Sequence, residues 1–180
     1  MKKVSIILIF GILASNLNAQ MNKNLTNVEV TNIHYCLCRD VSTDAVDFNT
    51  DHFRSIIANG IGIDPNQEGA NKLISLFLNE HFNDLICPKD PTDTTHRKKH
   101  IFKDMILIRG GFDIFNDIVM DPDEYSIDWN LYEIVNGKKE TLIDYIEYLI
   151  EREGDDDGDY AFLISDIRDL GGKRGAELDK

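Results

Sequence analysis

The chain has 180 residues, of which 32 are acidic and 19 are basic, and its formal net charge is −13. A field of this sign repels nucleic acid and anionic membranes and attracts a basic protein partner. The length suits one domain that buries a real hydrophobic core.

The N-terminus has the three-part pattern of a secretory signal peptide over residues 1–19. Lys2 and Lys3 form a basic start, residues 4–14 are largely apolar, and Ala19 offers a small residue for cleavage. The apolar run is too short to span a bilayer, and no later stretch is long and apolar enough to do so. We therefore expect a periplasmic or secreted protein without membrane insertion. Cleavage removes two lysines and no acid, which leaves a charge of −15.

Residues 20–50 are predicted to form an extended N-terminal segment ahead of a helical domain over residues 51–175. Within this segment, residues 28–39 alternate weakly between apolar and polar, which is typical of a short strand or an extended lead-in. It carries Cys36 and Cys38, and a third cysteine, Cys87, follows much later in the chain.

The three cysteines predict one disulfide in an oxidising compartment. Cys36 and Cys38 are too close to pair with each other in an extended segment, so we expect Cys87 to pair with Cys36 or Cys38. The alternative is a metal site formed by the three cysteines with His34 as a fourth ligand. Structural zinc sites more often place two residues between their cysteines, which favours the disulfide.

Helical periodicity begins after residue 50. Thr50 or Asp51 can cap a short apolar helix that Gly60 ends. Asn66 can cap the next helix, whose wide apolar stripe continues to residue 85 and includes His81 as a core histidine.

Three further helices are predicted in the second half of the chain. One runs from about His100 to the Gly110-Gly111 pair. A long irregular insertion then covers residues 112–136 and ends in an Asn-Gly tight-turn signal at residues 136–137. Thr141 caps the next helix, with Asp144 at the capping-box position. An acidic loop over residues 155–159 precedes the last helix, which two glycines end at residues 171–172.

These helices resemble the helix pairs of the ankyrin-repeat family. Thr-Leu-Ile-Asp-Tyr-Ile at residues 141–146 lies on the family's Thr-Pro-Leu-His-x-Ala helix start, and Asn-Gly-Ile-Gly-Ile-Asp at residues 59–64 is similar to its Gly-Ala-Asp-x-Asn turn. The pattern covers residues 53–173, with the Pro and His of the helix start replaced by Leu142 and Asp144. The resemblance implies a mainly α, stacked helix-pair solenoid that binds proteins through helices and loops and carries no catalytic residues.

The insertion supplies the predicted partner-binding residues. Aromatic side chains commonly anchor protein interfaces, and acids beside them favour a basic partner. The candidates are Tyr125, Asp128, Trp129 and Tyr132. We therefore expect an exported protein-binding module, in one form an immunity or inhibitor protein that blocks a secreted toxin or hydrolase.

A calcium-dependent structural or adhesion protein is the alternative. Asp155, Asp157 and Asp159 match positions one, three and five of a calcium loop. Tyr160 replaces the glycine at position six and Asp166 replaces the closing glutamate, and both departures favour a solvated loop without calcium.

The sequence gives little support for a histidine metal site or for a catalytic site. His96 and His100 are four residues apart, but the three basic residues between them would repel a metal cation. The chain has no nucleophile elbow and no Gly-rich phosphate loop, so we do not expect an enzyme.

Overall fold

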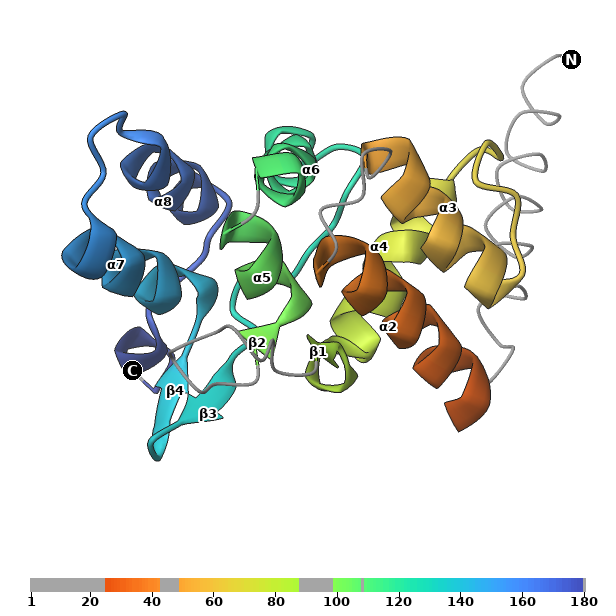
Figure 1. The fold of residues 1–180 in the computed structure, drawn as a ribbon, viewed down its shortest axis with the longest axis horizontal. Helices are drawn as coiled ribbons and strands as arrows, with labels where there is room; N and C mark the ends of the chain where they lie inside the picture. Colours follow the sequence, from red (N-terminus) through yellow and green to blue (C-terminus); the bar gives the residue numbers. More distant parts are fainter. Residues whose placement is uncertain (1–24, 43–48, 88–98, 108, 180) are drawn as a thin grey trace, which may run out of the picture.

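The computed structural model describes residues 25–42, 49–87, 99–107 and 109–179, and these residues are mainly helical (Figure 1). The predicted signal peptide lies outside the described residues. Among the described residues, every helix is too short or too polar to cross a lipid bilayer.

The described elements are helices with two small antiparallel hairpins. The α-helices are α2 (Asn27–Ser42), α3 (Thr50–Ile61), α4 (Ala70–Glu80), α5 (Ile101–Leu107), α6 (Arg109–Met120), α7 (Leu142–Glu153) and α8 (Asp159–Asp169). Short 3-10 turns occur at η1 (Phe82–Asp84) and η2 (Gly175–Glu177). The strands are β1 (Ile86–Cys87), paired with β2 (Lys99–His100), and β3 (Glu133–Val135), paired with β4 (Lys138–Glu140).

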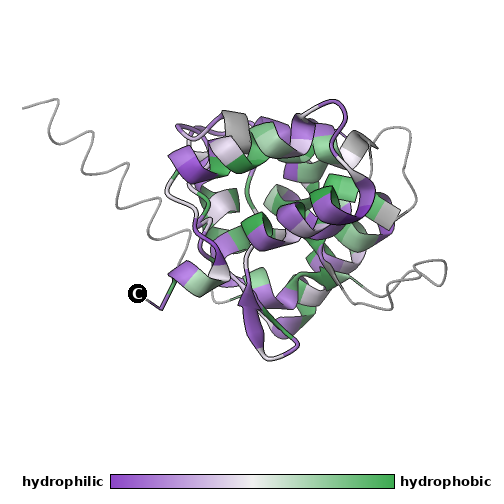
Figure 2. Cartoon of the chain, turned by 90° about the vertical axis from the view of Figure 1, so that its left-hand side faces the viewer, coloured by the Kyte–Doolittle hydropathy of each residue, from purple (hydrophilic) through white to green (hydrophobic). Residues whose placement is uncertain are grey.

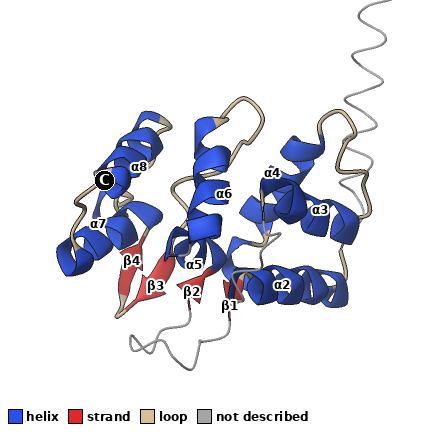
Figure 3. Ribbon diagram, turned by 45° about the horizontal axis from the view of Figure 1, so that its top comes forward, coloured by secondary structure: helices blue, strands red, loops and turns tan. Residues whose placement is uncertain are grey.

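The helices form two rows that face each other (Figure 1). One row contains α2, α5 and α7, and the other contains α3, α6 and α8; neighbours within each row are in contact. Across the rows, α2 packs on α3, α5 on α6, and α7 on α8. The additional helix α4 packs against α3. Both hairpins lie at the same side of the helices (Figure 3).

A continuous apolar core fills the space between the rows. Its largest fully buried side chains include Phe53, Phe102 and Phe115, one each from α3, α5 and α6. Hydrophilic residues dominate the β3–β4 hairpin, which projects from one end of the molecule (Figure 2). The core therefore joins all three helix pairs, and the described part of residues 51–175 has no separate second core.

The expected extended segment is wrong over residues 27–42, because these residues form helix α2. The buried residues Val30, Ile33, Leu37 and Val41 are spaced by three or four positions and face α3 and α5. Gly60 does not end α3 as predicted but lies inside it, where a Cβ atom would stand 2.2 Å from Cγ1 of Ile33. The absence of a side chain at Gly60 thus lets α2 approach α3 closely.

Two predictions for the middle of the chain are wrong. The Gly110-Gly111 pair does not end a helix, and residues 112–120 are not irregular. Helix α6 runs through both glycines to Met120, and the irregular stretch is confined to residues 121–132. A Cβ atom on Gly111 would stand 2.7 Å from the carbonyl oxygen of Met105. The absence of a side chain at Gly111 thus permits the tight corner between α5 and α6.

Local signals in the second half of the chain are confirmed. The capping box is present, since the amide of Thr141 donates to Oδ2 of Asp144 over 2.8 Å. Asn136 and Gly137 both have positive φ, 52° and 75°, as the tight turn between β3 and β4 requires. Nearer the N-terminus, the cap of α3 is Asn49 rather than Thr50 or Asp51, and α4 begins after Gly69 rather than at Asn66.

Candidate functional site

Two of the four predicted partner-binding residues point into the protein. Trp129 is only 6% exposed and packs edge-on against Phe115, with ring centroids 5.9 Å apart. Tyr125 is equally buried, and this burial is the main reason that the pKa of its hydroxyl is raised. The structure thus places both aromatic rings in the core, and partner binding at Tyr125 and Trp129 remains a prediction.

The segment that carries them is fastened to α4. The amide of Ser126 donates to Oγ of Ser75 over 3.0 Å, and the side chain of Asn79 donates to the carbonyl oxygen of Ser126 over 2.8 Å. Oδ1 of Asn79 also accepts from the amide of Asp128. These hydrogen bonds hold residues 121–132 against α4, which explains why a stretch with little regular structure buries two aromatic rings.

The other two predicted residues remain at the surface. Asp128 is exposed, and its carboxylate accepts a hydrogen bond from the amide of Asn130 over 3.0 Å. Tyr132 is 37% exposed, and Nζ of Lys139 lies 4.9 Å from its ring centroid. A basic side chain of the chain itself already occupies one face of this ring.

The larger acidic feature is a cleft of about 540 Å³ between the α5–α6 corner and the connection from α7 to α8. Its apolar part is lined by Ile106, Leu107, Phe112 and Tyr160, and its acidic part by Asp113, Glu153, Asp155, Asp156, Asp157 and Asp159. We call this feature the acidic cleft. Three segments form it, and they meet because α6 packs against α8.

The aromatic side chains form a rigid apolar wall of the acidic cleft. Phe112 of α6 and Tyr160 of α8 meet edge to face, with ring centroids 6.3 Å apart. Burial raises the pKa of Tyr160, and the negative charges of Glu153 and Asp155 add to this effect. The hydroxyl of Tyr160 therefore stays protonated at neutral pH.

One carboxylate of the acidic cleft has a structural role. Asp155 accepts hydrogen bonds from the amides of Tyr160 and Ala161, over 3.1 and 2.8 Å, and so caps the start of α8. Among the described residues, no lysine or arginine forms an ion pair with Asp113, Asp156, Asp157 or Asp159. The cleft thus carries excess negative charge beside an apolar wall, which suits an ammonium or guanidinium group on an apolar stem.

The predicted calcium ligands do not converge in this structure. Within the described part of the chain, the group of three candidate ligand atoms that lie within 4.8 Å of one another is formed by His34, Cys38 and Cys87, not by the aspartates of residues 155–159. Calcium binding at Asp155, Asp157 and Asp159 remains a prediction.

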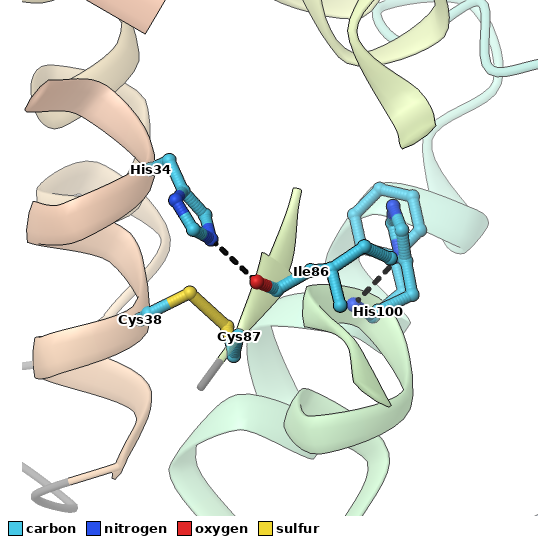
Figure 4. The surroundings of a disulfide bond; sticks show 6 residues. His34, Cys38, Ile86, Cys87 and His100 are labelled. Carbon is cyan, nitrogen blue, oxygen red and sulfur yellow. Dashed lines mark hydrogen bonds between the residues drawn. A yellow bond between two sulfur atoms is a disulfide. The ribbon is translucent and has the colours of Figure 1, made fainter. Parts of the chain in front are cut away.

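The predicted disulfide is confirmed, and its partner is Cys38. Cys38 of α2 is bonded to Cys87 of β1, while Cys36 is a free, half-buried thiol. His34 lies beside the disulfide, and its Nε2 donates to the carbonyl oxygen of Ile86 over 2.7 Å (Figure 4). The alternative of a metal site formed by all three cysteines with His34 is not what the structure brings together, because the group of His34, Cys38 and Cys87 leaves Cys36 out.

Among the histidines that the structure describes, His34 alone belongs to a group of candidate metal ligands. His96 lies outside the described residues. His100 is fully buried and stacks on Phe82 at 3.8 Å between ring centroids. Burial, helped by the charge of Lys103, lowers the pKa of His100 to about 3, so the ring is neutral at physiological pH. The predicted core histidine, His81, is half-buried against Phe77.

Comparison with known protein families, curated proteins and solved structures finds no match to this chain. What the acidic cleft can bind therefore follows from the residues that line it. The sequence draws attention to the Asp-rich loop over residues 155–159, but its local pattern assigns Phe112 and Asp113 to an irregular insertion. Their contribution depends on the packing of α6 against α8, which no local sequence pattern reveals.

Proposed function

We propose that this chain is an exported protein-binding module whose acidic cleft receives a basic side chain of a partner protein. One form of this function is an immunity or inhibitor protein that covers the working surface of a secreted toxin or hydrolase. The observation that carries the proposal is the acidic cleft, where six carboxyl side chains border an apolar wall.

The cleft suits lysine or arginine for two separate reasons. The apolar stem of either side chain can lie against Phe112 and Leu107, while the charged end remains among the carboxylates. The net charge of −13 also steers a basic partner toward the molecule before contact. Affinity would then come from the desolvated contact, and the association rate would depend on salt.

The architecture supports a binding role. Paired helices in two rows agree with the ankyrin-like stack that the sequence resembles, and ankyrin-like stacks bind proteins through helices and protruding loops. Export is supported by the signal-peptide pattern of residues 1–19 and by the Cys38–Cys87 disulfide, since disulfides persist mainly in oxidising compartments.

A charge-matched pair of variants tests the proposal. The cleft variant carries Asp156→Asn, Asp157→Asn and Asp159→Asn. The control variant carries Glu68→Gln, Glu80→Gln and Asp123→Asn, which removes the same number of negative charges from exposed positions that do not line the acidic cleft. Residues 20–180 of each form serve as bait for exported proteins of the source organism and its neighbours, at low and high salt.

The proposal predicts that wild type and control capture the same basic protein and that the cleft variant loses it. Equal loss in both variants would show that total charge, rather than the acidic cleft, binds the partner. Capture of nothing by the wild type would contradict a specific binding role.

A further inference from the structure

A second group of chemically reactive side chains lies where α2 packs against β1, and none of its residues lines the acidic cleft. His34 and Cys38 lie one turn apart on α2, so both face β1, where Cys87 is found. One ligand atom from each of these three side chains lies within 4.8 Å of the other two (Figure 4). Cys36, two positions from Cys38, faces a different direction and is not part of this group.

We propose that, once the disulfide is reduced, His34, Cys38 and Cys87 bind one thiophilic divalent cation, for which zinc is the best match. An imidazole and two thiolates are a preferred donor set for zinc, and three protein ligands leave the fourth tetrahedral position to water. The oxidised and reduced forms of the protein thus differ in whether they bind metal.

The backbone already holds the ligands at a suitable separation. The Cα atoms of Cys38 and Cys87 are 5.3 Å apart, and both side chains are about 95% buried. Helix α2 packs against β1, the strand that carries Cys87, and the hydrogen bond from Nε2 of His34 to the carbonyl oxygen of Ile86 adds to this contact. With the proton on Nε2, the lone pair of Nδ1 is the one that is free to bind the metal. This framework does not depend on the disulfide alone, so the two sulfur atoms remain neighbours after reduction.

A pocket of about 380 Å³ gives solvent access to His34. It is lined by Asn27, Val30, Thr31, His34, His81 and Asp84. Neither cysteine lines this pocket, so His34 is the member of the group that a hydrated cation in the pocket would meet first. Asp84 at the pocket also favours the approach of a cation.

The chemistry balances with a dithiol as the reductant. The dithiol supplies two electrons and two protons, is itself oxidised to a disulfide, and leaves Cys38 and Cys87 as thiols. Binding of the cation then releases both thiol protons, because only the thiolates are ligands. The disulfide form of the same dithiol is the oxidant for the reverse step: it takes back two electrons and two protons, the Cys38–Cys87 disulfide forms again, and the metal is released.

The test uses Co²⁺ as a spectroscopic probe on the full chain. The protein is reduced with a phosphine, exchanged into oxygen-free buffer and titrated with Co²⁺. We expect one equivalent to bind with a thiolate-to-cobalt charge-transfer band and intense tetrahedral ligand-field bands, both of which Zn²⁺ abolishes. The oxidised protein should show neither band. Absence of binding to the reduced chain, whether it remains folded or not, would overturn the proposal.

Variants assign the ligands. Cys38→Ser and Cys87→Ser should lose the charge-transfer band, and His34→Ala should weaken Co²⁺ binding by at least about 10-fold. Cys36→Ser is the matched control and should bind like the wild type. His34→Ala keeps its disulfide when oxidised, so its melting temperature in that form shows that the fold is intact. Equal weakening by Cys36→Ser, or full affinity in His34→Ala, would contradict the assignment.

Discussion

Nζ of Lys103 lies 2.8 Å from Oε1 of Glu140, although the lysine side chain is only 4% exposed. Lys103 belongs to α5, and it also forms an ion pair with Glu133. Glu133 and Glu140 are directly opposite each other in the β3–β4 hairpin, where two negative charges repel. One buried lysine therefore offsets one of the two negative charges and fastens the hairpin to α5.

Replacement of Lys103 should test this arrangement. Lys103→Met leaves two carboxylates close together and poorly solvated, so we expect a loss of about 3 kcal/mol in the free energy of unfolding, measured with urea. Lys138→Met, which changes an exposed lysine of the same hairpin, should change it by less than about 0.5 kcal/mol. Adding Glu133→Gln and Glu140→Gln to Lys103→Met should recover part of the loss. Equal effects of the two lysine variants would contradict the buried role of Lys103.

Trp129 should behave as a core residue. Its ring packs against Phe102 and Phe115, with centroids 6.4 and 5.9 Å away, so Trp129→Ala should cost about 3 to 5 kcal/mol of unfolding free energy. Tyr132→Ala, three residues later and partly exposed, should cost much less. The measurement is the melting temperature of each variant, and we expect Trp129→Ala to melt well below Tyr132→Ala. Equal melting temperatures would show that the ring of Trp129 does not support the core.

The difference between these two aromatics shows where the sequence was informative. The capping box of Thr141 and Asp144 and the turn at Asn136 were predicted correctly because each depends on residues within four positions. The burial of Trp129 depends on α5 and α6, which contribute Phe102 and Phe115. Nothing near residue 129 in the sequence carries that information.

The N-terminal helix could have been found from its spacing. Val30, Ile33, Leu37 and Val41 follow a helical period, but the polar residues between them were interpreted as weak alternation. The same error hid the His34–Cys38 pair, since positions four apart share a face only on a helix. The spacing of Cys36 and Cys38 did predict that Cys87 pairs with one of them, and the helix decides for Cys38, because that position faces β1.

His100 should make the protein sensitive to acid. Its pKa is about 3 in the folded protein and near 6.5 when unfolded, so the unfolded chain binds the extra proton between these values. Stability from the neutral ring is complete above pH 6.5 and is lost as the pH falls toward 3, at up to about 1.4 kcal/mol per pH unit. His100→Phe keeps an aromatic ring beside Phe82 and should reduce the slope of unfolding free energy against pH in this window. An unchanged slope would show that His100 does not cause the sensitivity.

The Cys38–Cys87 disulfide should dominate the stability that the cysteines provide. It closes a loop with a sequence separation of 49 residues, for which loss of the cross-link costs about 4 kcal/mol in the chain-entropy account. With metal chelated, Cys38→Ser should therefore melt well below the wild type, and Cys36→Ser should melt close to it. A similar melting temperature for all three would indicate that the helices hold α2 and β1 together unaided.

The acidic loop offers the test that separates a helix cap from a calcium site. Because Asp155 accepts the amides of Tyr160 and Ala161, Asp155→Ala should lower the free energy of unfolding by about 1 kcal/mol without calcium. Asp157 accepts no hydrogen bond among the described residues, so Asp157→Ala should be neutral under the same conditions. If millimolar calcium raises the melting temperature of the wild type and Asp157→Ala removes that gain, the calcium alternative is supported. If calcium changes neither protein, the loop serves only to start α8 and to supply charge to the acidic cleft.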